Sequence, residues 1–83
     1  MHVQVKYFAS IRETLGMGSE SVTTQATTLG GLRDALLARG GAHAEALARS
    51  RAVRMAVNQV MSDETAPLHD GAEVAFFPPV TGG

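Results

Sequence analysis

The fold is decided by the stretch Asp70-Gly71-Ala72-Glu73-Val74-Ala75-Phe76-Phe77-Pro78-Pro79, near the end of this 83-residue chain. Asp-Gly is a turn signal, and the residues after it alternate between two faces, which predicts a strand over 72–77. Val74 and Phe76 fall on one face, and Ala75 and Phe77 on the other. Proline has no amide hydrogen for a neighbouring strand and favours extended backbone, so the strand is expected to end before Pro78.

The sequence before this strand predicts one small domain with a single main helix. The other predicted elements are, in order, a strand over 2–8, a short helix over 11–15, a strand over 19–24 that pairs antiparallel with the first, the main helix over 29–39, a helical stretch over 42–50, a strand over 53–57 and a short strand at 60–61. Ser10 and Thr28 are expected to cap the starts of the first two helices, and Gly16 and Gly40 to end them. This order suits an α+β fold in which one helix packs across a sheet.

The composition of the chain argues against several classes of function. The net charge is −1 and the seven Lys and Arg residues are scattered, so neither nucleic acid nor an anionic membrane is an expected partner. The chain has no cysteine, so no side-chain thiol can act as a nucleophile or carry sulfur. No segment reads as a membrane span or a signal sequence, and the expected location is cytoplasmic. The three histidines are far apart and lack ligand-like neighbours, so no metal site is expected.

The tail over 78–83 has the properties of an arm that enters a partner. Pro78-Pro79 stiffens it, and an extended arm of this length reaches about 19 Å at roughly 3.1 Å per residue. Gly82 and Gly83 carry no side chain, so the backbone can pass through a narrow channel and the terminal carboxylate stays accessible. That carboxylate is the candidate reactive group.

Several segments resemble one known family. The run over 74–83, Val-Ala-Phe-Phe-Pro-Pro-Val-Thr-Gly-Gly, closely resembles the end of molybdopterin synthase small subunits, which are ubiquitin-like sulfur carriers. The likeness extends to residues 5–13, 56–59 and 67–74, whereas residues 29–50 match only in pattern. The resemblance implies a ubiquitin-like β-grasp fold, with a mixed sheet, parallel first and last strands and one main helix across one face. We expect residues 1–77 to form this domain and 78–83 to be its extended Gly-Gly tail.

The resemblance also implies a partner-binding surface made of Phe8, Met61 and Phe77. The family has an aromatic residue in the first strand, an aliphatic one after the middle hairpin and a phenylalanine before Pro-Pro. The aliphatic residue is commonly leucine, and methionine, with its flexible thioether, can still fill an apolar pocket. The alternative is that Phe8 and Met61 are ordinary core or edge residues. The tail residues expected to contact the partner are Pro78, Pro79, Val80, Thr81 and Gly82.

The chemistry that the resemblance implies takes place at Gly83. A ubiquitin-activating-like enzyme adenylates its carboxylate with ATP, and a sulfur nucleophile then leaves a thiocarboxylate. The large subunit of molybdopterin synthase uses this sulfur on a pterin precursor. No cofactor is expected on this chain, because ATP is consumed by the activating enzyme. The chain is then non-catalytic alone, and the catalytic residues for sulfur insertion are expected on the large subunit.

The sequence leaves three questions open. A sulfur carrier for another pathway, such as thiamine synthesis or tRNA thiolation, or a ubiquitin-like protein modifier, would use the same terminus. A non-catalytic β-grasp interaction module would instead carry a chemically silent diglycine. Arg12 either pairs with an acid of a partner or is solvated.

Overall fold

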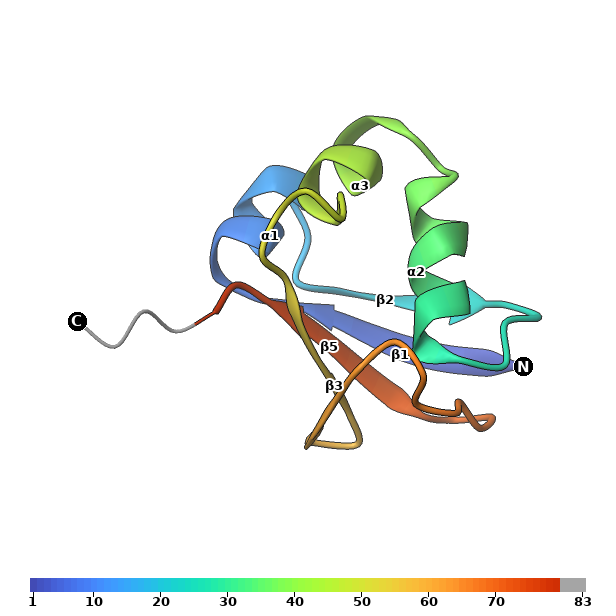
Figure 1. Cartoon of the computed structure of the whole chain (residues 1–83). Helices are drawn as coiled ribbons and strands as arrows, with labels where there is room; N and C mark the ends of the chain where they lie inside the picture. Colours follow the sequence, from blue (N-terminus) through green and yellow to red (C-terminus); the bar gives the residue numbers. More distant parts are fainter. Residues whose placement is uncertain (80–83) are drawn as a thin grey trace.

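A computed structural model describes residues 1–79, which form five strands and three helices (Figure 1). The elements are β1 (His2–Tyr7), α1 (Ala9–Leu15), β2 (Ser19–Thr23), α2 (Leu29–Leu37), α3 (Gly41–Ala46), β3 (Arg54–Val57), β4 (Val60–Ser62) and β5 (Glu73–Phe77). The predicted order of elements is confirmed, although some boundaries differ. Within residues 1–79, every helix is too short or too polar to cross a membrane.

All five strands belong to one mixed sheet, in the order β2-β1-β5-β3-β4. Strands β1 and β5 are parallel neighbours inside the sheet, with Val5 paired to Val74 and Tyr7 to Phe76. The β1–β2, β3–β4 and β3–β5 pairs are antiparallel. The predicted α+β, ubiquitin-like β-grasp arrangement, with parallel first and last strands, is confirmed.

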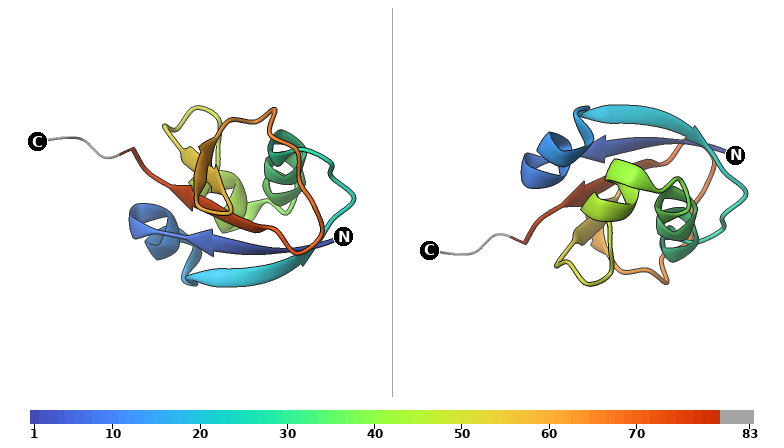
Figure 2. Two further views of the ribbon diagram at one scale, coloured as in Figure 1. Left: turned by 90° about the horizontal axis from the view of Figure 1, so that it is seen from below. Right: turned by 90° about the horizontal axis from the view of Figure 1, so that it is seen from above.

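The hydrophobic core lies between the sheet and the helices, which all lie on the same side of the sheet (Figures 1 and 2). The sheet contributes Val3, Val5, Tyr7, Met55, Val74 and Phe76, and the helices contribute Ile11, Leu29, Leu32, Leu36 and Ala46. Burying a large apolar side chain contributes about 1.5–3 kcal/mol, so this layer holds the helices on the sheet. Within residues 1–79, no helix covers the opposite face of the sheet.

Helix α1 begins earlier than predicted, and Ser10 does not cap it. Its N-cap is Phe8, which has an extended backbone and makes no side-chain hydrogen bond to the helix. The Phe8 carbonyl accepts from the amides of Ile11 and Arg12, at 3.2 and 3.3 Å. The helix starts at this point because Phe8 still belongs to the β1–β5 pairing and the chain turns at once at Ala9, where φ is 51°.

Two other predicted helix ends are confirmed. The Thr28 hydroxyl caps α2 by accepting from the Gly31 amide at 3.1 Å. Gly16 ends α1 in the left-handed conformation, with φ of 73°, which glycine adopts without steric strain. Helix α2 ends at Leu37, shortly before Gly40.

Helix α3 is shorter than predicted and ends at Ala46 instead of reaching Ser50. The cause is the buried Arg33 of α2, whose guanidinium donates to the carbonyls of Leu47 and Ala48, at 2.8 and 3.0 Å. These bonds satisfy carbonyls at the end of the helix and hold the following loop against α2. The chain is thereby directed toward β3.

Candidate functional site

The tail leaves the domain at the end of β5, beside the end of β1 (Figure 1). Past the paired strands, the Phe8 amide donates to the Phe76 carbonyl at 3.1 Å. This bond extends the parallel pairing by one position, so Phe8 and Phe77 are neighbours across two strands. Adjacent strands lie about 4.8 Å apart, so these two aromatic residues occupy neighbouring strand ends at the root of the tail.

Apolar side chains from neighbouring strands share the sheet face away from the helices. Exposure alternates along β5, and Ala75 and Phe77 are the side chains that point away from the core. The register then pairs Ala75 with Ala56 of β3, and Ala56 with Met61 of β4. Directly paired residues point to the same face of a sheet. We call this set, Phe8, Ala56, Met61, Ala75 and Phe77, the sheet-face patch.

The large side chains of the sheet-face patch are accessible. Phe8 is 45% exposed and Met61 is 58% exposed. Neither belongs to the core, and Met61 lies on an edge strand. Two alanines, Ala56 and Ala75, complete the apolar part of this face, and Ala56 is paired directly with Met61. An exposed apolar area of this kind is typical of a protein-binding surface.

Charged side chains border the patch. Lys6 of β1 and Glu73 of β5 form an ion pair at 2.9 Å, and both are substantially exposed, so the pair contributes little stability. Arg54 opens β3 and is paired directly with Phe77 in the antiparallel register. The surface therefore has an apolar centre with a cation next to the tail root.

A polar cluster supports the tail root from the core side. The Tyr7 ring stacks on Phe76, with centroids 6.2 Å apart, and its hydroxyl donates to Glu20 at 2.7 Å. Arg39 Nη1 and His43 Nε2 lie 2.7 and 2.8 Å from oxygens of the same carboxylate. Burial raises the pKa of Glu20, but the hydrogen bonds from His43, Tyr7 and Arg39 outweigh it and hold this pKa at about 2. Burial and the bond to Glu20 raise the pKa of Tyr7, so Glu20 is ionised and Tyr7 neutral at pH 7.

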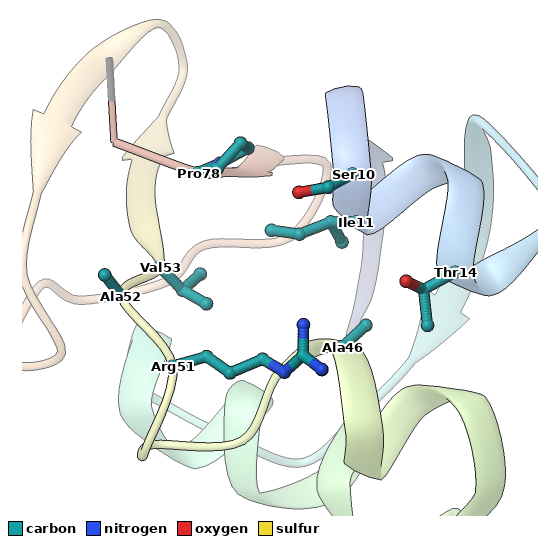
Figure 3. A pocket seen from close by; sticks show the side chains of 8 residues that line it. All are labelled: Ser10, Ile11, Thr14, Ala46, Arg51, Ala52, Val53 and Pro78. Atoms are coloured by element: carbon teal, nitrogen blue, oxygen red, sulfur yellow. The ribbon is translucent and has the colours of Figure 1, made fainter. Parts of the chain in front are cut away.

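A hollow of about 250 Å³ lies on the helix side of the tail root (Figure 3). It is lined by Ser10, Ile11, Thr14, Ala46, Arg51, Ala52, Val53 and Pro78. A hydroxyl becomes a strong nucleophile only beside a general base. Among the lining residues that the structure describes, no side chain is a carboxylate, an imidazole or a thiol.

The structure places the predicted binding residues that it describes on one face of the sheet and at the root of the tail. Phe8, Met61 and Phe77 share one sheet face, and Pro78 and Pro79 follow as half-buried residues. The remaining predicted site residues, Val80, Thr81, Gly82 and Gly83, lie outside the described residues.

Arg54 is a residue of this surface that was not predicted from the sequence. The alternation of Arg54 and Ala56 with larger apolar residues over 53–57 indicates that Arg54 lies on the outer face of its strand. The strand register was needed to show that Arg54 sits beside Phe77.

This chain is similar to proteins of one known family. The ThiS family matches residues 5–83. The molybdopterin synthase sulfur carrier subunit of Escherichia coli (strain K12) is 41% identical over 81 residues, which cover 98% of this chain and 99% of that protein. The crystal structure of small archaeal modifier protein 1 from Haloferax volcanii is 27% identical, with a TM-score of 0.77, and the match covers 95% of this chain and 98% of that one. A complex of subunits 1 and 2 of molybdopterin-converting factor from Helicobacter pylori 26695 contains a chain that is 27% identical, with a TM-score of 0.71 and full coverage of both chains. This chain belongs to the ThiS family.

Proposed function

We propose that this chain is the sulfur carrier subunit of a molybdopterin synthase and acts in molybdenum cofactor biosynthesis. The observation that carries the proposal is the 41% identity, over nearly the whole of both chains, to a relative of that name. The sheet-face patch supports it, because a carrier that delivers a group into another protein needs a docking surface beside the delivering end. The similarity to a chain in a two-subunit converting-factor complex supports a large-subunit partner.

The proposed reaction centre is the carboxylate of Gly83. A carboxylate is a poor electrophile until one of its oxygens is converted to a leaving group. Attack of that oxygen on the α-phosphorus of ATP releases pyrophosphate and forms an acyl-adenylate. A sulfur nucleophile at the oxidation level of hydrosulfide then attacks the acyl carbon, the bond from that carbon to the AMP oxygen breaks, and loss of the sulfur-bound proton gives a terminal thiocarboxylate. The chain has no cysteine that could hold the sulfur instead.

Three proteins of the cytoplasm would share this chemistry: an activating enzyme, the large subunit and this chain. The ATP site belongs to a ubiquitin-activating-like enzyme, so this chain holds no cofactor of its own. The groups that act on the pterin precursor belong to the large subunit. On this chain, the titratable cluster around Glu20 is committed to internal hydrogen bonds, and the hollow beside Pro78 has no general base among its lining residues. Its part is to bind, to orient the tail and to present the sulfur.

Intact-mass spectrometry tests this proposal. The full chain is incubated with its cognate activating enzyme, ATP and a sulfur source, and a sulfur-for-oxygen mass increase at the last residue is expected. A variant that lacks Gly83 is the matched control and should gain no sulfur. If the chain stays unchanged while the activating enzyme is demonstrably active, the sulfur-carrier function is wrong and the chain is a non-catalytic interaction module.

A second candidate is a sulfur carrier for another pathway, such as thiamine synthesis or tRNA thiolation, or a ubiquitin-like protein modifier. The likeness to small archaeal modifier protein 1, with a TM-score of 0.77, favours keeping this candidate. The partner separates the two functions. A molybdopterin synthase subunit is expected to convert the pterin precursor when its thiocarboxylate form is mixed with the large subunit. A modifier should instead form covalent conjugates with lysines of other proteins when supplied with the activating enzyme and ATP.

A further inference from the structure

Arg54 holds an unusual position at the edge of the sheet-face patch. It is exposed, it opens β3, and the antiparallel register places it directly opposite Phe77. Its side chain and that of Met61 border the same open hollow. A protein surface that covers both Met61 and Phe77 therefore covers the guanidinium as well.

Arg54 is also one of two Lys and Arg side chains without an internal counter-charge in the described part of the chain. The sequence has seven Lys and Arg residues, and five of them have a carboxylate within 4 Å: Lys6, Arg33, Arg39, Arg49 and Arg51. Within residues 1–79, only Arg12 and Arg54 have none. Arg12 lies on α1, where its guanidinium stands against Gly18 and outside the patch.

One acid borders the same hollow as Arg54 but does not form an ion pair with it. Asp63 follows β4, and its Oδ1 accepts from both the amide and the hydroxyl of Thr65. Those bonds lower the pKa of Asp63 and fix its carboxylate toward its own turn. Arg54 is exposed and has no carboxylate partner within residues 1–79, so docking must replace the water around it.

Removing an unpaired guanidinium from water costs several kcal/mol unless a counter-charge and hydrogen bonds replace the lost hydration. The planar guanidinium fork is matched best by a carboxylate, which accepts two parallel hydrogen bonds. We infer that Arg54 is a specificity residue for the large subunit, which must present an Asp or Glu side chain to it at the edge of the apolar surface that receives Phe77 and Met61. This inference rests on the proposed function for the identity of the partner. It adds a charge requirement that an apolar patch alone does not impose.

Binding kinetics between the full chain and its cognate large subunit test the inference. Arg54→Gln removes the charge, and the dissociation constant is expected to rise by about tenfold or more, with a weaker dependence of the association rate on salt. Arg54→Lys should retain part of the affinity, because it keeps the charge but loses the fork. The matched control is Gln25→Glu, which makes the same change in net charge at an exposed residue of the β2–α2 loop, at the far end of the sheet. Its dissociation constant should stay within about twofold of the original.

A charge exchange identifies the acid. Arg54→Glu is expected to bind more weakly than Arg54→Gln, and a lysine in place of the matching acid of the large subunit should restore its binding. If Arg54→Gln binds as well as the original chain does, or more tightly, the inference is wrong while the proposed function stands. If the original chain itself does not bind the large subunit, both the proposed function and the inference are wrong. Thermal unfolding of each variant verifies that the domain is folded.

Discussion

Phe8 and Phe76 are joined by a backbone hydrogen bond of 3.1 Å, from the amide of Phe8 to the carbonyl of Phe76. It extends the parallel β1–β5 pairing and lies where both segments change direction, into α1 at Ala9 and into the tail at Pro78. The Phe76 side chain is fully buried, so this bond ties the root of the tail to the core. The neighbouring side chains, the exposed Phe8 and the half-buried Phe77, are thus held on rigid backbone, which lowers the conformational entropy lost on binding.

Replacing Phe77 by alanine is expected to weaken binding to the large subunit by about tenfold or more, because aromatic side chains at the centre of an interface carry much of its binding energy. The domain should remain folded, since Phe77 points away from the core. Isothermal titration calorimetry and a thermal melt measure the two quantities.

The matched control for this change is Val60→Ala. Val60 is 65% exposed on β4, and its pairing with Val57 places it on the opposite face from Met61. Its loss should leave binding unchanged. Equal losses for the two variants, or none for either, would contradict the assignment of the docking surface to the sheet-face patch.

Deleting Gly83 is expected to abolish sulfur transfer while binding to the large subunit stays largely intact. The reason is that the proposal places the reacting carboxylate on Gly83 and most of the affinity on the patch. Product formation by the reconstituted synthase and a parallel binding titration separate the two effects. Full transfer activity in the shortened chain would rule out Gly83 as the acceptor.

The alternation of apolar and polar residues predicted β1 and β5 well. A strand with one face on the core must place its large apolar residues at every second position. Val3, Val5 and Tyr7 in β1, and Val74 and Phe76 in β5, are all buried as predicted. The parallel pairing of these strands came from family resemblance. Alternation reports which face of a strand is buried but not which strand lies beside it.

The parts that sequence did not predict depend on contacts between distant residues. Helix α1 starts at Ala9 because of a bond from Phe8 to β5, and α3 stops early because Arg33 of α2 reaches Leu47. For the same reason, alternation could place Arg54 on the outer face of its strand, but only the register with β5 put it beside Phe77.

Replacing Glu20 by glutamine is expected to lower the free energy of unfolding by about 1–2 kcal/mol at pH 7, after allowance for solvent screening. The pKa of Glu20 falls from an ordinary 4.5 to about 2 in the folded protein, so folding favours the ionised form. This contribution is complete above pH 4.5 and is lost as the pH falls through about 2. The difference between the original chain and the variant should therefore shrink across that interval. Denaturant titrations at several pH values measure it.

The control for the acid experiment is Glu13→Gln. Glu13 is exposed on α1 and forms no ion pair within the described part of the chain. Its replacement should change stability by less than about 0.5 kcal/mol at any of these pH values. A stability difference for Glu20→Gln that does not vary with pH would show that the carboxylate charge is not what stabilises the cluster.

Replacing Arg33 by methionine is expected to cost about 2–4 kcal/mol of folding stability, although methionine fills much of the same volume. The guanidinium is buried and donates to the Leu47 and Ala48 carbonyls. Its loss leaves the Leu47 carbonyl without this donor, whereas the Ala48 carbonyl keeps its bond from the Arg51 amide at 2.9 Å. Arg51→Gln is the matched control, because Arg51 is exposed and its nearest carboxylate is 3.9 Å away, and it should cost less than about 1 kcal/mol. Hydrogen exchange adds a local readout: amides of the loop before β3 should lose protection in Arg33→Met and keep it in Arg51→Gln. Equal stability of the two variants would mean that Arg33 does not hold this loop.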